Sequence, residues 1–327
     1  MKNLSLTLKT LALLLFAAHS VPTQAQPSLA KPAERQAALW PPPAGQIRVI
    51  LDTDAGNEVD DQWAIALALG FPQRLKIEGF VAAHYGQRGG VKGIAKSRTN
   101  IERTLAAAGM TGRFAIKNGS DPFTYRERFP DSEGVDFIIQ TARTATPENP
   151  LYLVSLGPAT NAAAALLKDP TIADRVIIFW HGRSDWPRRS ANFNAQNDPV
   201  AMQLLFELPC RFVLFDTGAN LNMPMEESER RVAATGPLGQ FIHDIRKPSP
   251  YARGADKGMF DLGDIAALID PSASEWEAVQ APRVSLDYLY DFKQQNGPMT
   301  RISVINREKS FALLDQSLAA IGKTPRN

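Results

Sequence analysis

Five carboxylates fall within ten positions near the start of the chain: Asp52, Asp54, Glu58, Asp60 and Asp61. They follow the apolar run 47–51, whose short and β-branched composition predicts a buried parallel strand. Such a strand ends at the carboxyl edge of its sheet, where open α/β folds bind their ligands. Crowded carboxylates repel one another, and a hard cation that prefers oxygen ligands relieves the repulsion. The segment therefore predicts a metal site for Ca²⁺, with Mg²⁺ as the less favoured ion.

Helix capping is the simpler interpretation of part of this cluster. Asp60 and Asp61 directly precede an apolar helical pattern that begins at Trp63, so they could cap that helix and favour its positive amino end. Capping does not account for Asp52 and Asp54, which come before the turn. We therefore favour the metal site.

The first 25 residues have the pattern of a cleaved secretory signal peptide. Lys2 and Lys9 precede an apolar run at 11–18, and small residues lead to a cleavage position after Ala25. The apolar run is too short to span a membrane. We therefore expect a periplasmic or secreted protein with no membrane association. A Pro-rich leader is expected at 26–46 and a single domain at 47–327.

Composition limits the partners of this protein. The formal net charge is only +2, and Arg183, Arg188 and Arg189 form a local patch rather than a long basic stripe. This argues against nucleic-acid binding. Cys210 is the only cysteine, so no disulfide can form within the chain. The expected partner is a small molecule, and a homo-oligomer is compatible with the sequence.

Strands and helices alternate from Ile47 onward. This alternation predicts an α/β fold, with an open, mostly parallel Rossmann-like sheet and helices on both faces. The expected strands are 47–51, 77–83, 114–116, 151–155, 176–180 and 211–215. The expected helices are 61–69, 95–108, 135–142, 160–167 and 199–206. After Asn220 the pattern is less regular, with short helical stretches and expected strands near Val284 and at 302–305.

Other polar loops follow the expected strands and could meet the acidic cluster at one sheet edge. They contain His84, the turn 155–161, the loop 181–198 with Asn192 and Asn194, and the segment 261–264. Each also has a structural explanation, because Thr160 or Asn161 could cap a helix and Asp198-Pro199 is a typical helix start.

In their order and spacing, these segments resemble the inosine-uridine-preferring nucleoside hydrolase family. The family's Asp-x-Asp-Pro-Gly with a following Asp-Asp is matched by 52–61, and its Leu-Gly-Pro-x-Thr-Asn turn by 156–161. Its Glu-Phe-Asn and Asp-Pro are matched by 192–194 and 198–199. Its late His-Asp pair is best matched by Gly263-Asp264. The resemblance covers the chain from Ile47 to about Ile269.

The resemblance implies a Ca²⁺-dependent hydrolase of the N-glycosidic bond of ribonucleosides or related ribosides. It implies that Asp54 acts as general base on a metal-bound water that attacks the anomeric carbon. The implied metal ligands are Asp54, Asp61, Asp264 and the backbone carbonyl of Leu156. The implied ribose contacts are Asp60, Asn194 and Asp264, with Asn192 toward the 5′ side. Carboxylates suit this chemistry, since the sugar gains oxocarbenium character as the bond breaks.

Several positions depart from the family pattern. Two additional residues before Asp60 make Glu58 a further candidate near the metal, and Trp186 stands where a sugar-contacting Asn is expected. Gly263 stands where the family often has a His near the departing base, so weak assistance to the leaving group is expected. His84 and His181 are the imidazoles that could replace that acid.

Two other functions remain compatible with the residues. The segment Leu51-Asp52-Thr53-Asp54 is similar to the opening motif of haloacid-dehalogenase-like phosphatases, in which the first Asp is a nucleophile. A non-catalytic periplasmic protein that binds sugars or nucleosides could keep the same fold and metal. Comparing p-nitrophenyl riboside with p-nitrophenyl phosphate separates the three functions.

Overall fold

The computed structural model describes residues 35–249, 252–255 and 257–323. The signal peptide expected at 1–25 and the first part of the expected leader lie outside the described residues. Within these residues the chain forms an eight-stranded sheet of order β3-β2-β1-β4-β5-β6-β8-β7. Neighbouring strands are parallel except β7 and β8, which are antiparallel. The expected mostly parallel α/β sheet is confirmed.

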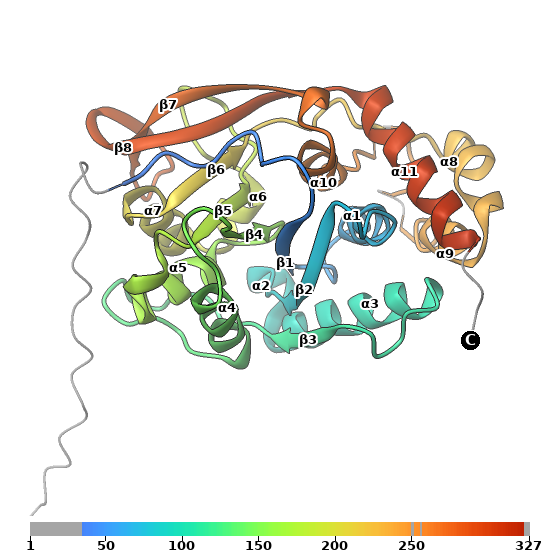
Figure 1. Cartoon of the computed structure of the whole chain (residues 1–327), viewed down its shortest axis with the longest axis horizontal. Coiled ribbons are helices and arrows are strands. Elements are labelled where there is room, and N and C mark those ends of the chain that lie inside the picture. Colours follow the sequence, from blue (N-terminus) through green and yellow to red (C-terminus); the bar gives the residue numbers. More distant parts are fainter. Residues whose placement is uncertain (1–34, 250–251, 256, 324–327) are drawn as a thin grey trace, which may run out of the picture.

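The elements lie close to the predicted ranges over most of the chain (Figure 1). The strands are β1 (Ile47–Thr53), β2 (Leu75–Ala82), β3 (Ala115–Asn118), β4 (Leu151–Ser155), β5 (Val176–His181), β6 (Arg211–Phe215), β7 (Ser274–Val284) and β8 (Tyr290–Ile305). The α-helices are α1 (Asp60–Leu69), α2 (Gly86–Gly89), α3 (Gly93–Ala107), α4 (Glu133–Arg143), α5 (Thr160–Lys168), α6 (Phe193–Asn197), α7 (Pro199–Glu207), α8 (Met225–Arg231), α9 (Pro237–Asp244), α10 (Leu262–Ile269) and α11 (Arg307–Gly322).

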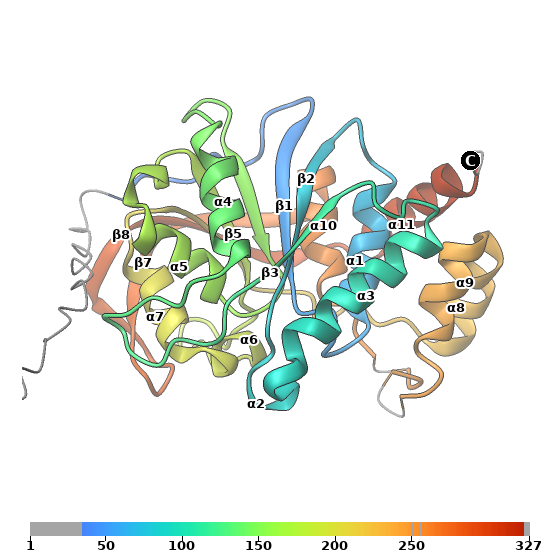
Figure 2. The ribbon, with the colours of Figure 1, turned by 90° about the horizontal axis from the view of Figure 1, so that it is seen from below.

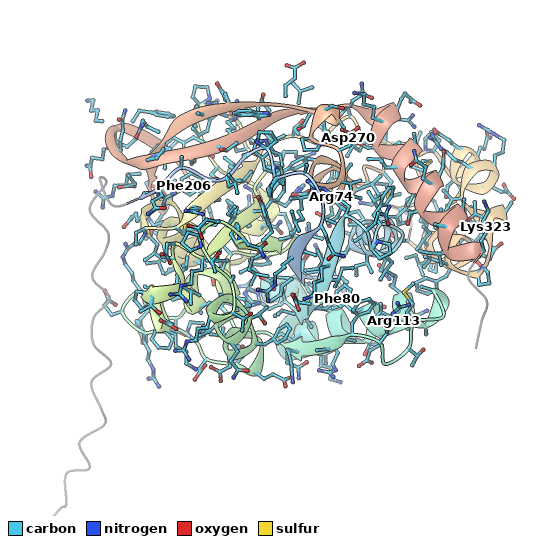
Figure 3. All side chains as sticks on the ribbon, in the orientation of Figure 1. Arg74, Phe80, Arg113, Phe206, Asp270 and Lys323 are labelled. Carbon is cyan, nitrogen blue, oxygen red and sulfur yellow. The ribbon has the colours of Figure 1, made fainter. Side chains whose placement is uncertain are left out.

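Alternation along the strands explains why helices cover both faces of the sheet. Val49 and Leu51 belong to the core layer that contains α1, α3, α10 and α11, whereas Ile50 belongs to the layer with α4, α5 and α7. Figure 2 shows these two groups of helices on opposite sides of β1 and β2. In Figure 3, Phe80 lies in the interior and Lys323 lies at the end of α11.

The order in which successive strands join the sheet changes direction between β1 and β4. β2 and β3 lie on one side of β1, while β4, β5 and β6 lie on the other. At such a switch point the connections leave the sheet in opposite directions, so a crevice opens at the carboxyl ends of the two strands. Asp54 directly follows β1 and Leu156 directly follows β4. Both residues therefore flank the place where this fold class binds ligands.

The described part of the leader packs against the domain. The Arg35 guanidinium is buried and donates hydrogen bonds to the carbonyls of Leu205 and Leu208, at 2.8 and 2.7 Å. The Trp40 side chain is also buried, with its ring centroid 5.5 Å from that of Phe179. Residues 35–46 thus contribute to the core of the domain, although they form neither helix nor strand.

The carboxyl-terminal part differs most from the sequence expectation. β7 and β8 form a long antiparallel hairpin with register shifts around Pro282, and β8 also pairs with β6. Prolines and bulges interrupt the alternation of apolar and polar residues that identifies strands. This explains why the sequence predicted strands only near Val284 and at 302–305. Helix α11, capped by Asn306, was not anticipated. Among the described residues, no helix is both long and apolar enough to cross a membrane.

Candidate active site

A cavity of about 500 Å³ opens at the carboxyl edge of the sheet, beside the switch point. The loops after β1, β4 and β5, the short helices α2 and α6, and the approach to α10 all contribute to its wall. The buried part of this wall, called the floor below, consists of Asp54, Asp60, Asp61, Leu156, His181, Asn194 and Asp261. The more exposed part, called the rim, includes Glu58, Arg88, Arg183, Asp185, Arg189, Asn192, Phe193 and Phe260.

Three floor carboxylates form a compact cluster. Oxygen atoms of Asp60, Asp61 and Asp261 all lie within 4.8 Å of one another. Asp60 and Asp61 begin α1, and Asp261 directly precedes α10, so two positive helix ends face this cluster. Asp261 was missed as a site residue by sequence reasoning, and its only signal was its place in the polar segment before an apolar helix.

Asp54 lies beside this cluster and is buried. Its Oδ2 atom has no hydrogen-bond partner among the described residues. Burial, together with the charges of Asp61 and Asp60, raises the pKa of Asp54 well above its usual range. A Cβ atom at Gly157 would lie 3.1 Å from Asp54 Cβ, so glycine lets the turn after β4 approach this carboxylate closely. A buried, unpaired carboxylate oxygen is a feature that a cation would satisfy.

Repulsion also affects the pKa of Asp61. Burial and the neighbouring Asp60 raise the pKa of Asp61 to about 7, although Thr53 Oγ1 donates a hydrogen bond to it. The floor carries little local positive charge to offset these acids. Lys257 Nζ lies 3.3 Å from Asp60 and 2.6 Å from Glu58, so it links the floor to the rim.

Asn194 fixes the opposite side of the floor. Its Nδ2 atom donates hydrogen bonds to the carbonyls of Leu156, at 2.7 Å, and His181, at 3.0 Å. A carbonyl oxygen has two lone pairs, so the Leu156 oxygen keeps one for a further partner. Asn192 lies on the rim, where its side chain accepts a 2.9 Å hydrogen bond from Ala195 N and caps α6.

Asp264 lies behind the floor rather than in the lining of the cavity. It is fully buried, and its Oδ2 atom is 2.7 Å from His181 Nδ1. Burial raises the pKa of Asp264 to about 6, and although burial lowers the pKa of His181, the Asp264 carboxylate raises it overall. Asp264 also lies near Asp261, with ligand atoms of Asp261, Asp264 and His181 within 4.8 Å.

Gly263 does not face the cavity, contrary to expectation. A Cβ atom there would lie 2.6 Å from Phe215 Cζ and 2.9 Å from Leu221 Cδ1, so this position faces the core. Phe260, three residues earlier, lines the cavity instead. The interpretation of position 263 as the place beside a departing base is therefore wrong. Its side-chain direction depends on how α10 packs, which the local sequence does not reveal.

Asp52 and Trp186 are held outside the cavity lining. Asp52 accepts hydrogen bonds from Ser155 Oγ at 2.9 Å and Asn161 Nδ2 at 2.8 Å, so it fixes the turn after β4. Burial raises the pKa of Asp52 to about 7. Trp186 packs against Tyr290 instead, with ring centroids 4.9 Å apart. Both contacts indicate structural roles.

His84 is also absent from the cavity lining. Its Nδ1 atom accepts a 3.0 Å hydrogen bond from Gly86 N, and its Nε2 atom lies 2.7 Å from Thr160 Oγ1. Thr160 Oγ1 in turn donates to Asp198 Oδ2 at 2.7 Å. Burial lowers the pKa of His84 to about 4, which favours the neutral ring. His84 therefore joins the loop after β2 to α5 rather than contacting a substrate.

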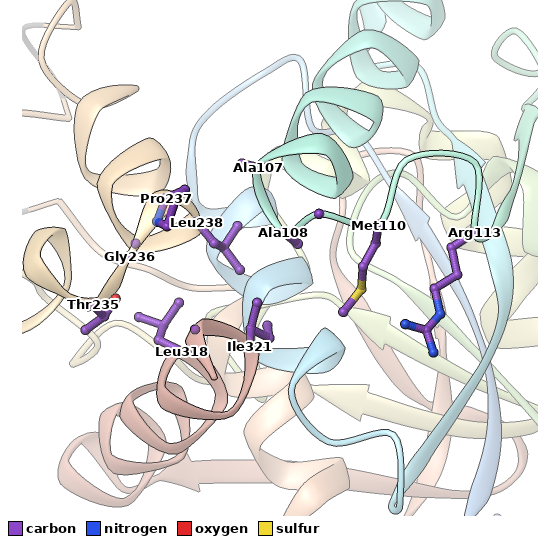
Figure 4. A pocket seen from close by; sticks show the side chains of 13 residues that line it. Ala107, Ala108, Met110, Arg113, Thr235, Gly236, Pro237, Leu238, Leu318 and Ile321 are labelled. Carbon is purple, nitrogen blue, oxygen red and sulfur yellow. The ribbon is translucent and has the colours of Figure 1, made fainter. Parts of the chain in front are cut away.

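A second, smaller cavity of about 160 Å³ lies between the end of α3, α9 and α11 (Figure 4). Its labelled side chains include Met110, Leu238, Leu318 and Ile321, with Arg113 as the charged group. No carboxylate or imidazole belongs to the described lining of this cavity. It therefore lacks the groups for the chemistry that the larger cavity offers.

The doubly covered sheet with acids at its switch point is the fold of nucleoside hydrolases. A purine-preferring ribonucleoside hydrolase from Gardnerella vaginalis aligns with a TM-score of 0.67 at 19% identity, over 84% of this chain and 99% of that chain. A plant nucleoside hydrolase, PpNRh1, gives a TM-score of 0.66 at 21% identity, with the same coverage of 84% and 99%. These likenesses confirm the predicted fold.

Sequence comparison identifies the family. Residues 49–287 match the model of the inosine-uridine preferring nucleoside hydrolases. The non-specific ribonucleoside hydrolase RihC of Salmonella paratyphi B is 27% identical over 249 residues, which cover 69% of this chain and 79% of that protein. The chain belongs to the inosine-uridine preferring nucleoside hydrolase family and is an N-glycosyl hydrolase.

Proposed function

We propose that this chain hydrolyses the N-glycosidic bond of ribonucleosides or related ribosides in the 500 Å³ cavity, with the help of a bound Ca²⁺ ion. The observation that carries the proposal is the floor itself. Four buried carboxylates, those of Asp54, Asp60, Asp61 and Asp261, gather at the switch point, and Asp54 Oδ2 has no partner among the described residues.

The donor set fits a hard divalent cation. Every available ligand atom from Asp54, Asp61, Asp261 and the Leu156 carbonyl is oxygen, which suits Ca²⁺ and disfavours softer metals. Burial, together with repulsion from neighbouring carboxylates, raises the pKa values of Asp54, Asp61 and Asp261, and a bound cation would favour their charged forms again. Asp261 replaces Asp264 in the proposed ligand set because it lines the cavity and Asp264 does not. When bound, the ion would acidify water and orient it.

Asp54 is the proposed general base. Its unpaired oxygen can accept a proton from the attacking water. The water oxygen forms a bond to the anomeric carbon, and the bond from that carbon to the nucleobase breaks. The departing nucleobase takes the electron pair of the broken bond and gains a proton from solvent, and Asp54 later returns the proton that it accepted to solvent. Asp60 and Asn194 are the proposed contacts of the ribose hydroxyls, and the floor carboxylates would stabilise positive charge on the sugar ring.

The wall around the leaving group offers limited proton donation. Phe260 cannot donate a proton, and His181 is the imidazole that lines the cavity among the described residues. Activated ribosides, whose aglycones leave without protonation, are therefore the proposed best substrates in the laboratory. Asn192 on the rim remains the proposed contact toward the 5′ side.

Turnover of p-nitrophenyl riboside by the full chain tests the proposal. We expect release of nitrophenolate that is lost after chelation and recovered with Ca²⁺, and lost in Asp54→Asn. Family membership argues against the phosphatase function, so p-nitrophenyl phosphate should not be hydrolysed. Ribose binding without any turnover would instead favour the non-catalytic binding protein.

We also propose that the protein is exported to the periplasm or beyond. Support comes from the charged start, short apolar run and small residues of the first 25 positions. Cell fractionation followed by amino-terminal sequencing tests this, with Gln26 as the expected first residue. A cytoplasmic protein that retains Met1 would contradict export.

A further inference from the structure

Basic side chains stand on the rim of the cavity directly above its acidic floor. Arg88 comes from α2, and Arg183 and Arg189 come from the loop after β5, yet all three line the same cavity as the floor carboxylates. A ribose held by the floor would direct its remaining substituents toward this rim.

Two of these arginines are stacked on aromatic rings of the same wall. The guanidinium carbon of Arg88 lies 4.7 Å from the ring centroid of Phe193, and that of Arg183 lies 4.5 Å from the ring centroid of Phe260. A guanidinium that lies over a ring is attracted to it without using its N–H groups in a hydrogen bond. These N–H groups match the geometry of a phosphate or carboxylate.

Neither guanidinium is occupied by the acids around it. Among the described residues, Arg88 and Arg183 form no ion pair and no hydrogen bond, although six carboxylates line the cavity. Lys257 behaves differently, because it pairs with Glu58 and Asp60 and so neutralises part of the floor. The charges of these two arginines are therefore not neutralised by a direct ion pair with any described residue.

Two other arginines, exposed like Arg88 and Arg183, lie in the loop after β5 and serve for comparison. Arg188 does not line the cavity, has a side chain that is 74% exposed, and only approaches Asp185 at 3.9 Å. Arg189 lies 3.7 Å from Asp185 and is thus partly engaged. Arg88 and Arg183 differ from both by lying over aromatic rings, and from Arg188 also by their place in the cavity wall.

We propose that this site takes ribosides that carry an anionic group, and that Arg88 and Arg183 bind that group. The inference rests on the proposed function, since the ribose must sit on the acidic floor. The anion is either a phosphate on the sugar or a carboxylate on the aglycone. The reaction stays a hydrolysis in which water adds to the anomeric carbon and the aglycone leaves with a proton, so the anionic group is unchanged.

Matched pairs of substrates test the proposal and distinguish the two sources of charge. Inosine is compared with inosine 5′-monophosphate, and uridine with orotidine, which carries a carboxylate on the base. We expect kcat/KM to be at least about tenfold higher for one charged member, mainly through KM, and to fall as salt is added. Preference for neither charged member would overturn the proposal.

Variants test whether Arg88 and Arg183 cause the preference for charged substrates. Arg88→Gln and Arg183→Gln should each reduce the ratio of charged to neutral kcat/KM by about tenfold, and Arg183→Lys should restore only part of it. Arg188→Gln is the matched control, and its ratio should equal that of the wild type. A ratio that survives both Gln variants would contradict the assignment. Failure to cleave any riboside, p-nitrophenyl riboside included, would instead defeat the proposed function itself.

Discussion

His181 Nδ1 lies 2.7 Å from Asp264 Oδ2, and this contact keeps the Asp264 carboxylate behind the wall of the cavity. Asp261, one helical turn earlier, places its carboxylate among those of Asp60 and Asp61. The two acids of the same short segment therefore have different surroundings, and the difference can be measured.

Asp261→Asn should weaken Ca²⁺ binding more than Asp264→Asn does. The first change removes a charged oxygen from the floor, whereas the second removes a partner of His181. Calorimetric titration of the metal-free proteins with Ca²⁺ measures both affinities. A larger loss in Asp264→Asn would restore the ligand assignment that the sequence resemblance implies.

Asp54→Asn should abolish catalysis and stabilise the metal-free fold. Loss of the proposed base should lower kcat by at least about 10²-fold. Burial and neighbouring charges raise the pKa of Asp54, so a neutral amide relieves repulsion and should raise the melting temperature in a chelator. Activity assays and thermal unfolding test the two parts. Wild-type turnover by the folded variant would refute the role of Asp54.

Common nucleosides should be cleaved poorly compared with an activated riboside. Phe260 lines the cavity and cannot protonate a departing base, while general acid assistance is typically worth about 10²–10⁴-fold. A nitrophenolate leaves without that help. The measurement is kcat/KM for inosine, uridine and p-nitrophenyl riboside on one preparation. Comparable values would mean that another group, with His181 as the first candidate, already serves as the acid.

Phe260→His and Gly263→His should have opposite consequences. An imidazole at position 260 would stand in the cavity wall and should improve inosine cleavage relative to p-nitrophenyl riboside. At position 263 even a Cβ atom would lie 2.6 Å from Phe215, so His should lower the melting temperature. Kinetics and thermal unfolding of both variants test this pair. A stable Gly263→His protein with improved inosine cleavage would contradict the placement of position 263.

His84 should make the fold less stable in acid. The unfolded chain binds a proton at His84 below about pH 6.5, whereas burial lowers its pKa to about 4 in the folded chain. The contribution of the neutral His84 ring to the free energy of unfolding is therefore fully present above pH 6.5 and is lost as the pH falls toward 4. The total loss is on the order of 3 kcal/mol. The free energy of unfolding, measured with denaturant at pH 7 and pH 4.5, should fall less between these two pH values for His84→Gln than for the wild type. Equal losses would show that His84 does not contribute.

The sequence by itself determined the six parallel strands from β1 to β6 and the main acids. β4 and β6 have the predicted bounds because each is a short apolar run between clear turns, and such periodicity is a local property. Asp54, Asp60 and Asp61 reach the floor because a strand end and a helix start, both local features, lie only a few residues apart.

Only the tertiary structure decided which of the remaining polar residues belong to the cavity. Asp261 rather than Asp264 lines the wall because the packing of α10 against Phe215 sets the rotation of that helix. His84 is drawn into contact with Thr160 behind the site, and Arg183 is stacked on Phe260, which comes from a distant part of the chain. Such contacts depend on how whole elements pack, and packing between distant segments leaves no periodic signal in the sequence.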